Sequence, residues 1–457
     1  MTKKKRIPLL GKLFIVGVAA TIAYNLWARW GLDEVDDQKL LLYEMYPLSW
    51  VDQGGFRGMT AHLTRIQDLG IDYIWLAPFY PSGGVDGGYD ITDYTDVDPR
   101  LGTLDDFDHF VEAANKLNIR VITDLVLNHT SDQHPWFQLS ASGNPKYADY
   151  YHWSDEDLGW GTMFDGSSAF TWHAKRQQFY SHIYNTSQPD LNWDNPDVRA
   201  EFQDIIDFWT LEHGVAGFRI DSVQLIGKNF TKTILPREQL GTTAGLFKYY
   251  MHPQTFEILH ELLDDRDLFT MGEIGVPIYP MFNSLVAPHG PLTAGINVMA
   301  ANSIDKSLGF IDTKTSLARA ERSLKHWGEH PSYIATLESH DGPRFTSRAN
   351  IDGKAALDLL FGSDARIICL YQGEELGLTN PELSDNIADY DDIQTIMRYE
   401  TAIAAGADPA ETITRLKAES RDNARQPLPL EEYDVQRTDP NSCFNYARIL
   451  IQNWKSD

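Results

Sequence analysis

Short apolar runs alternate with amphipathic stretches along most of the chain. The amphipathic stretches have the period of a helix, and the apolar runs have the length and composition of buried strands. This alternation predicts an α/β fold with a parallel sheet, and eight strand–helix units predict a TIM-type (β/α)₈ barrel. The expected strands are Leu40–Pro47, Tyr73–Pro78, Arg120–Leu127, a run from Gly217, Leu268–Gly275, a weak run near Gly295–Ala301, Tyr333–Glu338 and Arg366–Leu370.

Helices are expected at Ala61–Gly70, Asp105–Leu117, Asp197–His213 and Ser442–Trp454. The stretch from His129 to Asp194 has no regular period and is rich in aromatic residues, Asp, Ser and Gly. Because so long a loop in a compact domain is normally functional or a subdomain, we expect a small inserted subdomain over the site. The barrel would then comprise residues 39–128 and 195–457, with the inserted subdomain at 129–194.

The first residues differ from the rest of the chain. Lys3 to Arg6 are basic, and the run from Leu13 to Ala23 is apolar. This layout is typical of a signal peptide or a short signal anchor, although the run is shorter than the roughly 20 residues of a full span. Residues 1–38 are thus expected to be such a segment plus a linker, with possible membrane attachment. The protein would be secreted or membrane-anchored, or cytoplasmic if a basic amphipathic leader stands here instead.

Composition and net charge limit the kinds of molecule that the protein is expected to bind. The chain of 457 residues is 42% hydrophobic, as expected of a globular protein, and its formal net charge is −26. That charge argues against nucleic acid or anionic lipid as a partner of the folded body and suits a neutral ligand. The two cysteines, Cys369 and Cys443, lie among apolar residues and are expected to be buried free thiols.

Charged side chains follow several predicted strands. In G-F-R-I-D-S, Gly217 to Ser222, Phe218 and Ile220 alternate with Arg219 and Asp221, so the charged pair shares one face of the strand. Other strands end in polar side chains at Asp124, Asn128 and His129, at Glu273, and at Glu338, His340 and Asp341. We expect these strand ends to meet at one mouth of the barrel, where Arg219 would hold Asp221 ionised.

Three close carboxylates suit one reaction class in particular. Since like charges repel, one of Asp221, Glu273 and Asp341 must stay protonated. A protonated acid facing a carboxylate is the arrangement of glycoside hydrolysis, and a separation of about 5–5.5 Å makes the carboxylate a nucleophile. A site for Mg²⁺ or charges scattered on loops are the alternatives, but no phosphate-binding glycine loop accompanies the acids.

These motifs resemble the α-amylase superfamily of glycoside hydrolases, family 13, from about Leu41 to Trp454. The segments D-L-V-L-N-H (124–129), G-F-R-I-D-S (217–222), G-E-I-G (272–275) and E-S-H-D (338–341) stand in the order of its four signature segments. The resemblance implies Asp221 as nucleophile, Glu273 as general acid/base and Asp341 as stabiliser of the distorted sugar. It implies further that Arg219 orients Asp221 and that His129 and His340 bind ring hydroxyls.

Other segments are similar to the oligo-1,6-glucosidase, maltase and dextran-glucosidase group: Q-P-D-L-N (188–192), H-T-S-D-Q-H-P-W-F (129–137), Y-Q-G-E-E-L-G (371–377), S-R-D-N-A-R (420–425) and D-G-G-Y (86–89). By this resemblance Tyr89 would stack on the terminal glucose. Asp86 and Arg425, or Arg421 in its place, would close the pocket around that glucose. The protein would be a retaining, exo-acting α-glucosidase on short oligosaccharides. Ser222, after the nucleophile, favours α-1,4 over α-1,6 linkages.

Departures from the family lead to two more expectations. The loop after the first strand keeps only Asp52 of the acidic calcium ligands, so we expect no metal or other cofactor there. The chain ends at Asp457, where relatives continue into a β-sandwich, so that domain is expected to be absent.

Two alternatives to hydrolysis stay open. A transglucosidase or a sugar isomerase of the trehalose-synthase kind would share the glucosyl intermediate and differ in the acceptor. A non-catalytic ectodomain resembling the heavy chains of amino-acid transporters would fit the basic, then apolar, amino terminus.

Overall fold

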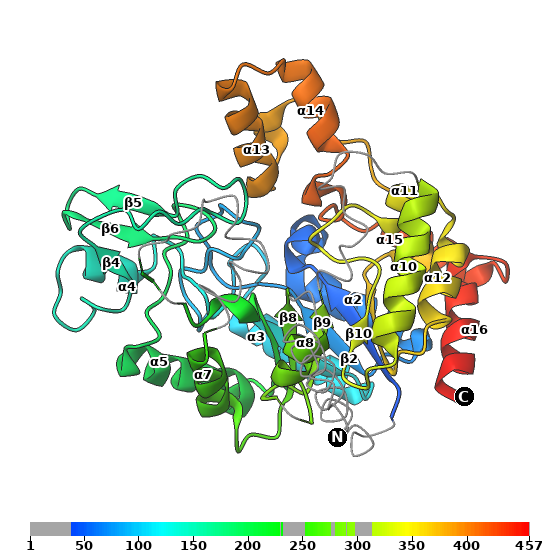
Figure 1. Ribbon diagram of the computed structural model, residues 1–457. Helices are drawn as coiled ribbons and strands as arrows, with labels where there is room; N and C mark the ends of the chain where they lie inside the picture. The colour runs from blue at the N-terminus through cyan, green and yellow to red at the C-terminus, as the bar shows by residue number, and fades with distance from the viewer. Residues whose placement is uncertain are drawn as a thin grey trace, which may run out of the picture.

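Eight parallel strands form one sheet that curls into a barrel (Figure 1). The computed structural model describes residues 38–228, 230–231, 252–275, 279–288, 290–297 and 313–456. The strand order is β10-β11-β1-β2-β3-β7-β8-β9, and a parallel bridge between Gly295 and Tyr333 joins the two outer strands. The strands are β1 Leu40–Met45, β2 Tyr73–Leu76, β3 Arg120–Leu125, β7 Gly217–Ile220, β8 Phe269–Ile274, β9 Ala294–Asn297, β10 Ile334–Ala335 and β11 Ile367–Tyr371. The predicted (β/α)₈ barrel is confirmed.

The seventh predicted strand is shorter than expected. Tyr333–Glu338 was predicted, and the strand β10 keeps two residues of it. The chain leaves the sheet because Glu338 turns inward, where its carboxylate accepts hydrogen bonds from the backbone N–H of Phe345 at 2.7 Å and from Arg344 at 3.0 Å. Burial of a charged group with two partners fixes this turn.

Helices cover the outside of the barrel (Figure 1): α2 Gly55–Ile66, α3 Leu104–Lys116, α5 Pro196–Asp207, α7 Gln254–Leu263, α8 Tyr279–Leu285, α10 Thr313–Gly328, α11 Phe345–Ala349, α12 Gly353–Phe361 and α16 Cys443–Ser456. The helix predicted at Ala61–Gly70 begins earlier, because the shortened loop before it folds as a 3₁₀ turn, Pro47–Gln53, that runs into α2. Gly70 does end the segment, in the left-handed conformation at φ 68°. Past α5 the backbone continues as a π turn, Phe208–Glu212.

The stretch predicted as a subdomain carries its own small sheet. The strands β4 Trp153–Ser154, β6 Gln178–Ser181 and β5 Phe170–His173 are antiparallel in that order, and the helix α4 Pro135–Ala141 packs beside them. It lies to one side of the barrel (Figure 1). Backbone hydrogen bonds join the first and last residues of the subdomain. The N–H of Leu191 donates to the carbonyl oxygen of Asn128 at 3.0 Å, and an antiparallel bridge links His129 to Asp190.

A second excursion, after β11, was not predicted. The helices α13 Ile393–Ala404 and α14 Pro409–Lys417 form a hairpin that projects from the body of the molecule (Figure 1). The chain then returns through a 3₁₀ turn, Arg421–Asn423, and the helix α15 Leu430–Thr438. The base of this hairpin brings new charged groups to the barrel mouth.

Close packing inside the barrel explains the glycine that begins β7. A Cβ atom on Gly217 would lie 1.8 Å from the carbonyl oxygen of Phe269 on the neighbouring strand. Only glycine lets the two strands approach so closely. Cys369 is buried and Cys443 is partly buried, and both are free thiols, as predicted.

The predicted signal peptide or anchor, residues 1–38, lies almost wholly outside the described residues. Within the part of the chain that the structure describes, no helix is long and apolar enough to cross a membrane.

Candidate active site

Arg219 on β7 joins three carboxylates at the mouth of the barrel. Its Nη1 donates to Asp221 Oδ1 at 2.6 Å and to Asp124 Oδ1 at 2.8 Å. Its Nη2 lies 2.9 Å from Oε2 of Glu273, at the end of β8. The alternation of β7 places Arg219 and Asp221 on one face, while Phe218 and Ile220 pack in the core. The predicted Arg219–Asp221 pair is confirmed.

Ser222 holds Glu273 from the other side. Its backbone has φ 47° and ψ 46°, an unusual conformation for a residue other than glycine. This turn directs the Ser222 backbone N–H at Glu273 Oε2, 3.0 Å away. Its hydroxyl lies 2.5 Å from that of Tyr184 in the inserted subdomain. The strained backbone of Ser222 thus helps to position the carboxyl group of Glu273.

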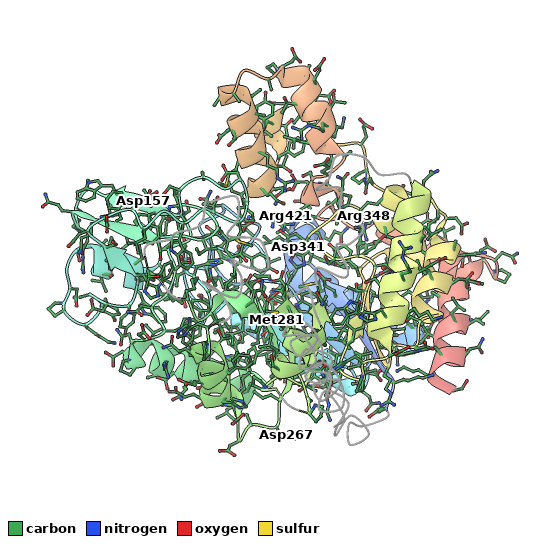
Figure 2. The ribbon with its side chains drawn as sticks, in the orientation of Figure 1. Asp157, Asp267, Met281, Asp341, Arg348 and Arg421 are labelled. Carbon is green, nitrogen blue, oxygen red and sulfur yellow. The ribbon has the colours of Figure 1, made fainter. Side chains whose placement is uncertain are left out.

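Asp341, which follows β10, is surrounded by cationic groups. Its Oδ2 lies 3.3 Å from Nε2 of His340. Its Oδ1 accepts hydrogen bonds from Arg425 at 3.2 Å and from Arg421 at 3.4 Å. Figure 2 shows Asp341 and Arg421 together between the barrel and the projecting hairpin.

Arg425, or Arg421 in its place, was expected to close the pocket with Asp86. Arg421, rather than Arg425, forms the ion pair with Asp86, between Nη2 and Oδ1 at 2.8 Å. Asp392 before α13 fixes Arg421 by accepting from its Nε at 2.7 Å. Arg425 lies instead over the ring of Tyr46 at 5.3 Å and donates to the carbonyl oxygen of His340. The ion pair between Arg421 and Asp86 thus depends on the hairpin, because Asp392 at its base holds the guanidinium of Arg421 in position.

His340 is enclosed by protein groups. Its Nδ1 lies 2.5 Å from Oε1 of Glu44 on β1, and its Nε2 lies 2.6 Å from the hydroxyl of Tyr89. The rings of Tyr89 and His340 stack at 5.4 Å. Because both ring nitrogens have protein partners, the expected bond from His340 to a sugar hydroxyl stays a prediction.

The imidazole of His129 has a different environment. Its Nε2 lies 3.0 Å from Nε2 of Gln188 and 3.2 Å from the carbonyl oxygen of Tyr89. Gln188 also donates to Asp86 Oδ2 at 3.0 Å. Burial lowers the pKa of His129 to about 4, so the ring is neutral at neutral pH.

Most of the predicted residues line one small cavity of about 110 Å³: Asp86, Tyr89, His129, Asp221, Ser222, Glu273 and Asp341. Phe164 and Tyr184, which were not predicted, complete its lining. Ligand pockets for drug-sized molecules have volumes of roughly 300–1,000 Å³, so this cavity suits a single small ring. Arg219, His340 and Arg425 stand behind its wall.

The three carboxyl groups have different proton affinities. Burial raises the pKa of Glu273 to about 7, helped by the charges of Asp221 and Asp341 and opposed by Arg219. Burial also raises the pKa of Asp221, against Arg219. At Asp341 burial has the same tendency, but His340, Arg421 and Arg425 outweigh it and hold the pKa below its ordinary value. Glu273 is therefore the group suited to carry a proton near neutral pH.

Three residues near the site escaped the sequence analysis. Tyr184 and Phe164 lie in the irregular subdomain, where no pattern distinguishes them from many other aromatic residues. Glu44 could have been found, because it is the one charged residue in the apolar run L-L-L-Y-E-M of β1.

The predicted absence of calcium concerns the loop after β1. Asp52 stands there in the 3₁₀ turn and is exposed. Over the described residues, no group of three or more His, Cys, Asp or Glu side chains could hold a metal ion. The expectation itself stays a prediction.

Comparisons with known proteins give matches over most of the chain. The family model described as "Alpha amylase, catalytic domain" matches residues 29–438. Trehalose-6-phosphate hydrolase of Escherichia coli (strain K12) is 35% identical over 424 residues, which cover 86% of this chain and 74% of that protein. Oligo-1,6-glucosidase of Parageobacillus thermoglucosidasius is 33% identical over 482 residues, covering 91% and 83%.

Solved structures give the same result. Trehalose-6-phosphate hydrolase of Bacillus licheniformis matches with a TM-score of 0.80 at 30% identity, over 92% of this chain and 84% of that chain. Isomaltulose synthase of Erwinia rhapontici NX5 matches with a TM-score of 0.81 at the same identity and coverage. These enzymes favour catalysis over the alternative of a non-catalytic ectodomain. The chain belongs to the α-amylase family and is a glycoside hydrolase.

Proposed function

We propose that the protein is a retaining, exo-acting α-glucosidase that releases terminal glucose from short oligosaccharides. The observation that carries this proposal is the single guanidinium of Arg219 that contacts both Asp221 and Glu273. Such a bridge keeps the two carboxyl groups close, which favours a nucleophile about 5–5.5 Å from the acid over a gap that holds a water.

The proposed reaction has two steps. Asp221 attacks the anomeric carbon while Glu273 gives its proton to the leaving glycosidic oxygen, and a covalent glucosyl ester forms. Glu273, now ionised, then takes a proton from water, whose oxygen attacks the anomeric carbon and releases Asp221. Asp341, held ionised by its cationic neighbours, would stabilise positive charge on the distorted sugar ring.

The cavity supports an exo mode of action. Its small volume and the ion pair between Asp86 and Arg421 favour one terminal ring over a chain that passes through. Its described lining includes four carboxylates and no Lys or Arg, which disfavours a phosphate group inside the cavity itself.

Product analysis tests the proposal. Maltose, isomaltose, sucrose, trehalose and trehalose 6-phosphate are incubated with the wild-type chain and with Asp221→Asn, and products are followed by proton NMR. We expect glucose, first as the α-anomer, with maltose cleaved faster than isomaltose. A β-anomer as the first product contradicts retention, and conversion of sucrose mainly to an isomer assigns the chain to the sugar isomerases.

Ser222 gives a separate prediction for linkage. Its side chain lines the cavity, and in α-1,6-acting relatives Val tends to occupy this position. We expect Ser222→Val to lower the ratio of maltose to isomaltose kcat/KM by about tenfold, the typical effect of a small change in pocket shape. Val both removes the hydroxyl and is strained at φ 47°. Ser222→Ala is the control, because it removes the hydroxyl without adding a branched side chain. An unchanged ratio in a folded Val variant contradicts a role in linkage.

We expect Glu44 to be a positioning residue that acts through His340. Although burial alone lowers it, the pKa of His340 is raised by Asp341 and Glu44. Glu44→Gln removes one of these two charges, so the protonated imidazole should be lost at a lower pH. We expect kcat/KM to fall by roughly tenfold, in line with the loss of one hydrogen bond to a charged group, and the imidazole titration of His340, followed by NMR, to move to lower pH.

A matched control separates this effect from packing. Glu375 is also a buried barrel carboxylate, and it accepts hydrogen bonds from the hydroxyls of Tyr43 and Tyr433. Glu375→Gln should lower the melting temperature without moving the titration of His340. If Glu44→Gln behaves in the same way, Glu44 is merely structural.

A further inference from the structure

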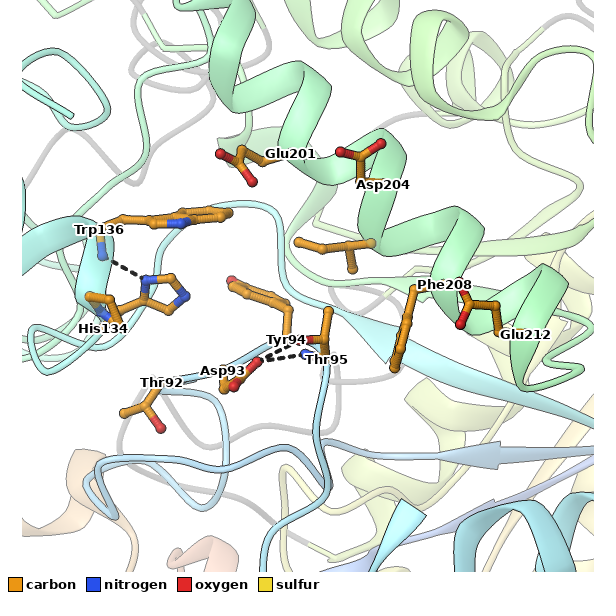
Figure 3. A pocket seen from close by; sticks show the side chains of 12 residues that line it. Thr92, Asp93, Tyr94, Thr95, His134, Trp136, Glu201, Asp204, Phe208 and Glu212 are labelled. Carbon is orange, nitrogen blue, oxygen red and sulfur yellow. Dashed lines mark hydrogen bonds between the residues drawn. The ribbon is translucent and has the colours of Figure 1, made fainter. Parts of the chain in front are cut away.

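A second pocket, of about 430 Å³, lies outside the catalytic cavity, where the inserted subdomain meets α5 (Figure 3). Its walls come from the loop after β2, the start of α4, and the face of α5 with the π turn beyond it. The lining residues are Thr92, Asp93, Tyr94, Thr95, His134, Pro135, Trp136, Glu201, Asp204, Ile205, Phe208 and Glu212. This volume lies within the range of small-molecule sites.

His134 offers this pocket a hydrogen-bond donor. Its Nδ1 accepts a bond from the backbone N–H of Trp136 at 3.1 Å, so the proton of the neutral ring is on Nε2. Burial lowers the pKa of His134 to about 4 and keeps the ring neutral. The side chain is 5% exposed, and Nε2 points into the pocket between Trp136 and Tyr94 (Figure 3). Among the described residues, Nε2 has no hydrogen-bond partner. Nε2 is therefore free to donate to an acceptor on a ligand in the pocket.

Carboxylates supply acceptors on the opposite side. Asp204 and Glu212 are exposed on α5 and on the π turn that follows it. Oδ1 of Asp93 accepts hydrogen bonds from the backbone N–H and the hydroxyl of Thr95. Lys146, outside the lining, pairs with Glu201 at 3.0 Å. Since the described lining has no Lys or Arg, an anionic ligand would be repelled.

Aromatic rings provide the apolar walls. Trp136 and Phe208 are half-buried and face the space from two sides (Figure 3). Tyr94 forms a fixed floor, since its hydroxyl lies 2.9 Å from the carbonyl oxygens of both Val126 and His129 and can donate its one proton to either. The pocket is therefore largely preformed.

We propose that this pocket is a second carbohydrate site, which binds a neutral sugar or short oligosaccharide. A hydroxyl group can accept from His134 Nε2 and also donate to a carboxylate, and a sugar ring carries several of them beside apolar C–H faces that pack on aromatic rings. An amine would satisfy the carboxylates but would leave the histidine donor unpaired. The pocket needs no part of the catalytic machinery, although the choice of glucose-containing probes rests on the proposed function.

Calorimetric titration tests the proposal. The full chain carrying Asp221→Asn, which should not consume the probe, is titrated with maltotriose at neutral pH. We expect two binding sites. In the same background, Asp204→Ala/Glu212→Ala should weaken one site at least tenfold, and Trp136→Leu should do the same. The matched control is Asp267→Ala/Glu400→Ala, which removes two exposed carboxylates elsewhere on the molecule and should leave both sites intact.

The outcomes separate this proposal from the proposed function. One site that is lost in Asp204→Ala/Glu212→Ala supports the second site even if the catalytic cavity fails to bind. One site that survives in both pocket variants, or no binding at all, overturns the second site. Spermidine provides a last comparison: binding of this polyamine that depends on Asp204 and Glu212, when maltotriose binding does not, assigns the pocket to cations and also overturns the proposal.

Discussion

Replacing Asp221 by Asn is expected to lower kcat/KM for maltose by at least about 10⁴-fold, because the amide cannot form the glucosyl ester and no other group takes its place. The change preserves size and leaves Arg219 in contact with Asp124 and Glu273. Steady-state kinetics on freshly purified wild type and variant measure the effect. Thermal unfolding of both chains checks that the variant is folded.

Asp124→Asn is the matched control for Asp221→Asn. Asp124 is buried and bonded to the same guanidinium, but it does not line the cavity. We expect its loss of kcat/KM to be at least ten times smaller than that of Asp221→Asn. Activities of the Asp221→Asn variant and wild type within tenfold of one another would falsify the nucleophile assignment.

Replacing Glu273 by Gln is expected to lower kcat/KM for maltose by about 10²–10⁴-fold, the usual worth of a general acid. The size of the loss should depend on the leaving group. With 4-nitrophenyl α-glucoside the first step needs little protonation, so kcat/KM should change far less. Added azide should raise turnover of this substrate by the variant, because azide attacks the glucosyl ester without a general base.

The pH profile provides a second readout for Glu273. The acid must be protonated to act, and its pKa is raised to about 7 by burial and by the neighbouring carboxylates. Wild-type kcat/KM should therefore fall as the pH rises through about 7, and Glu273→Gln should lack this limb. An equal loss on both substrates, or an alkaline limb that persists in the variant, contradicts the assignment.

The active-site carboxylates could be predicted from local pattern because parallel strands end at one edge of a barrel. Once Arg120–Leu127, Gly217–Ser222 and Leu268–Gly275 are identified as strands, their last polar residues must converge. The period of two in β7 was enough to place Arg219 beside Asp221, since alternation in a strand fixes which side chains share a face. These parts of the site depend on contacts within a strand or between adjacent strands.

The remaining contacts depend on segments far apart in the chain. The choice between Arg421 and Arg425 as partner of Asp86 was decided by Asp392, at the base of a helical hairpin that carries no motif. The link of Glu44 to His340 spans most of the chain. The contact of Tyr184 with Ser222 joins the inserted subdomain to the end of β7.

The barrel, the order of its strand ends and the acids that meet there could therefore be predicted from the amino-acid pattern. Hydrophobic period and strand polarity are local properties of the chain, and they are sufficient for this. The pattern could not predict which arginine pairs with Asp86, which carboxylate contacts His340, or that the pKa of Glu273 is raised while that of Asp341 is lowered. Burial and the distances between charges set these properties, and both come from packing between remote segments.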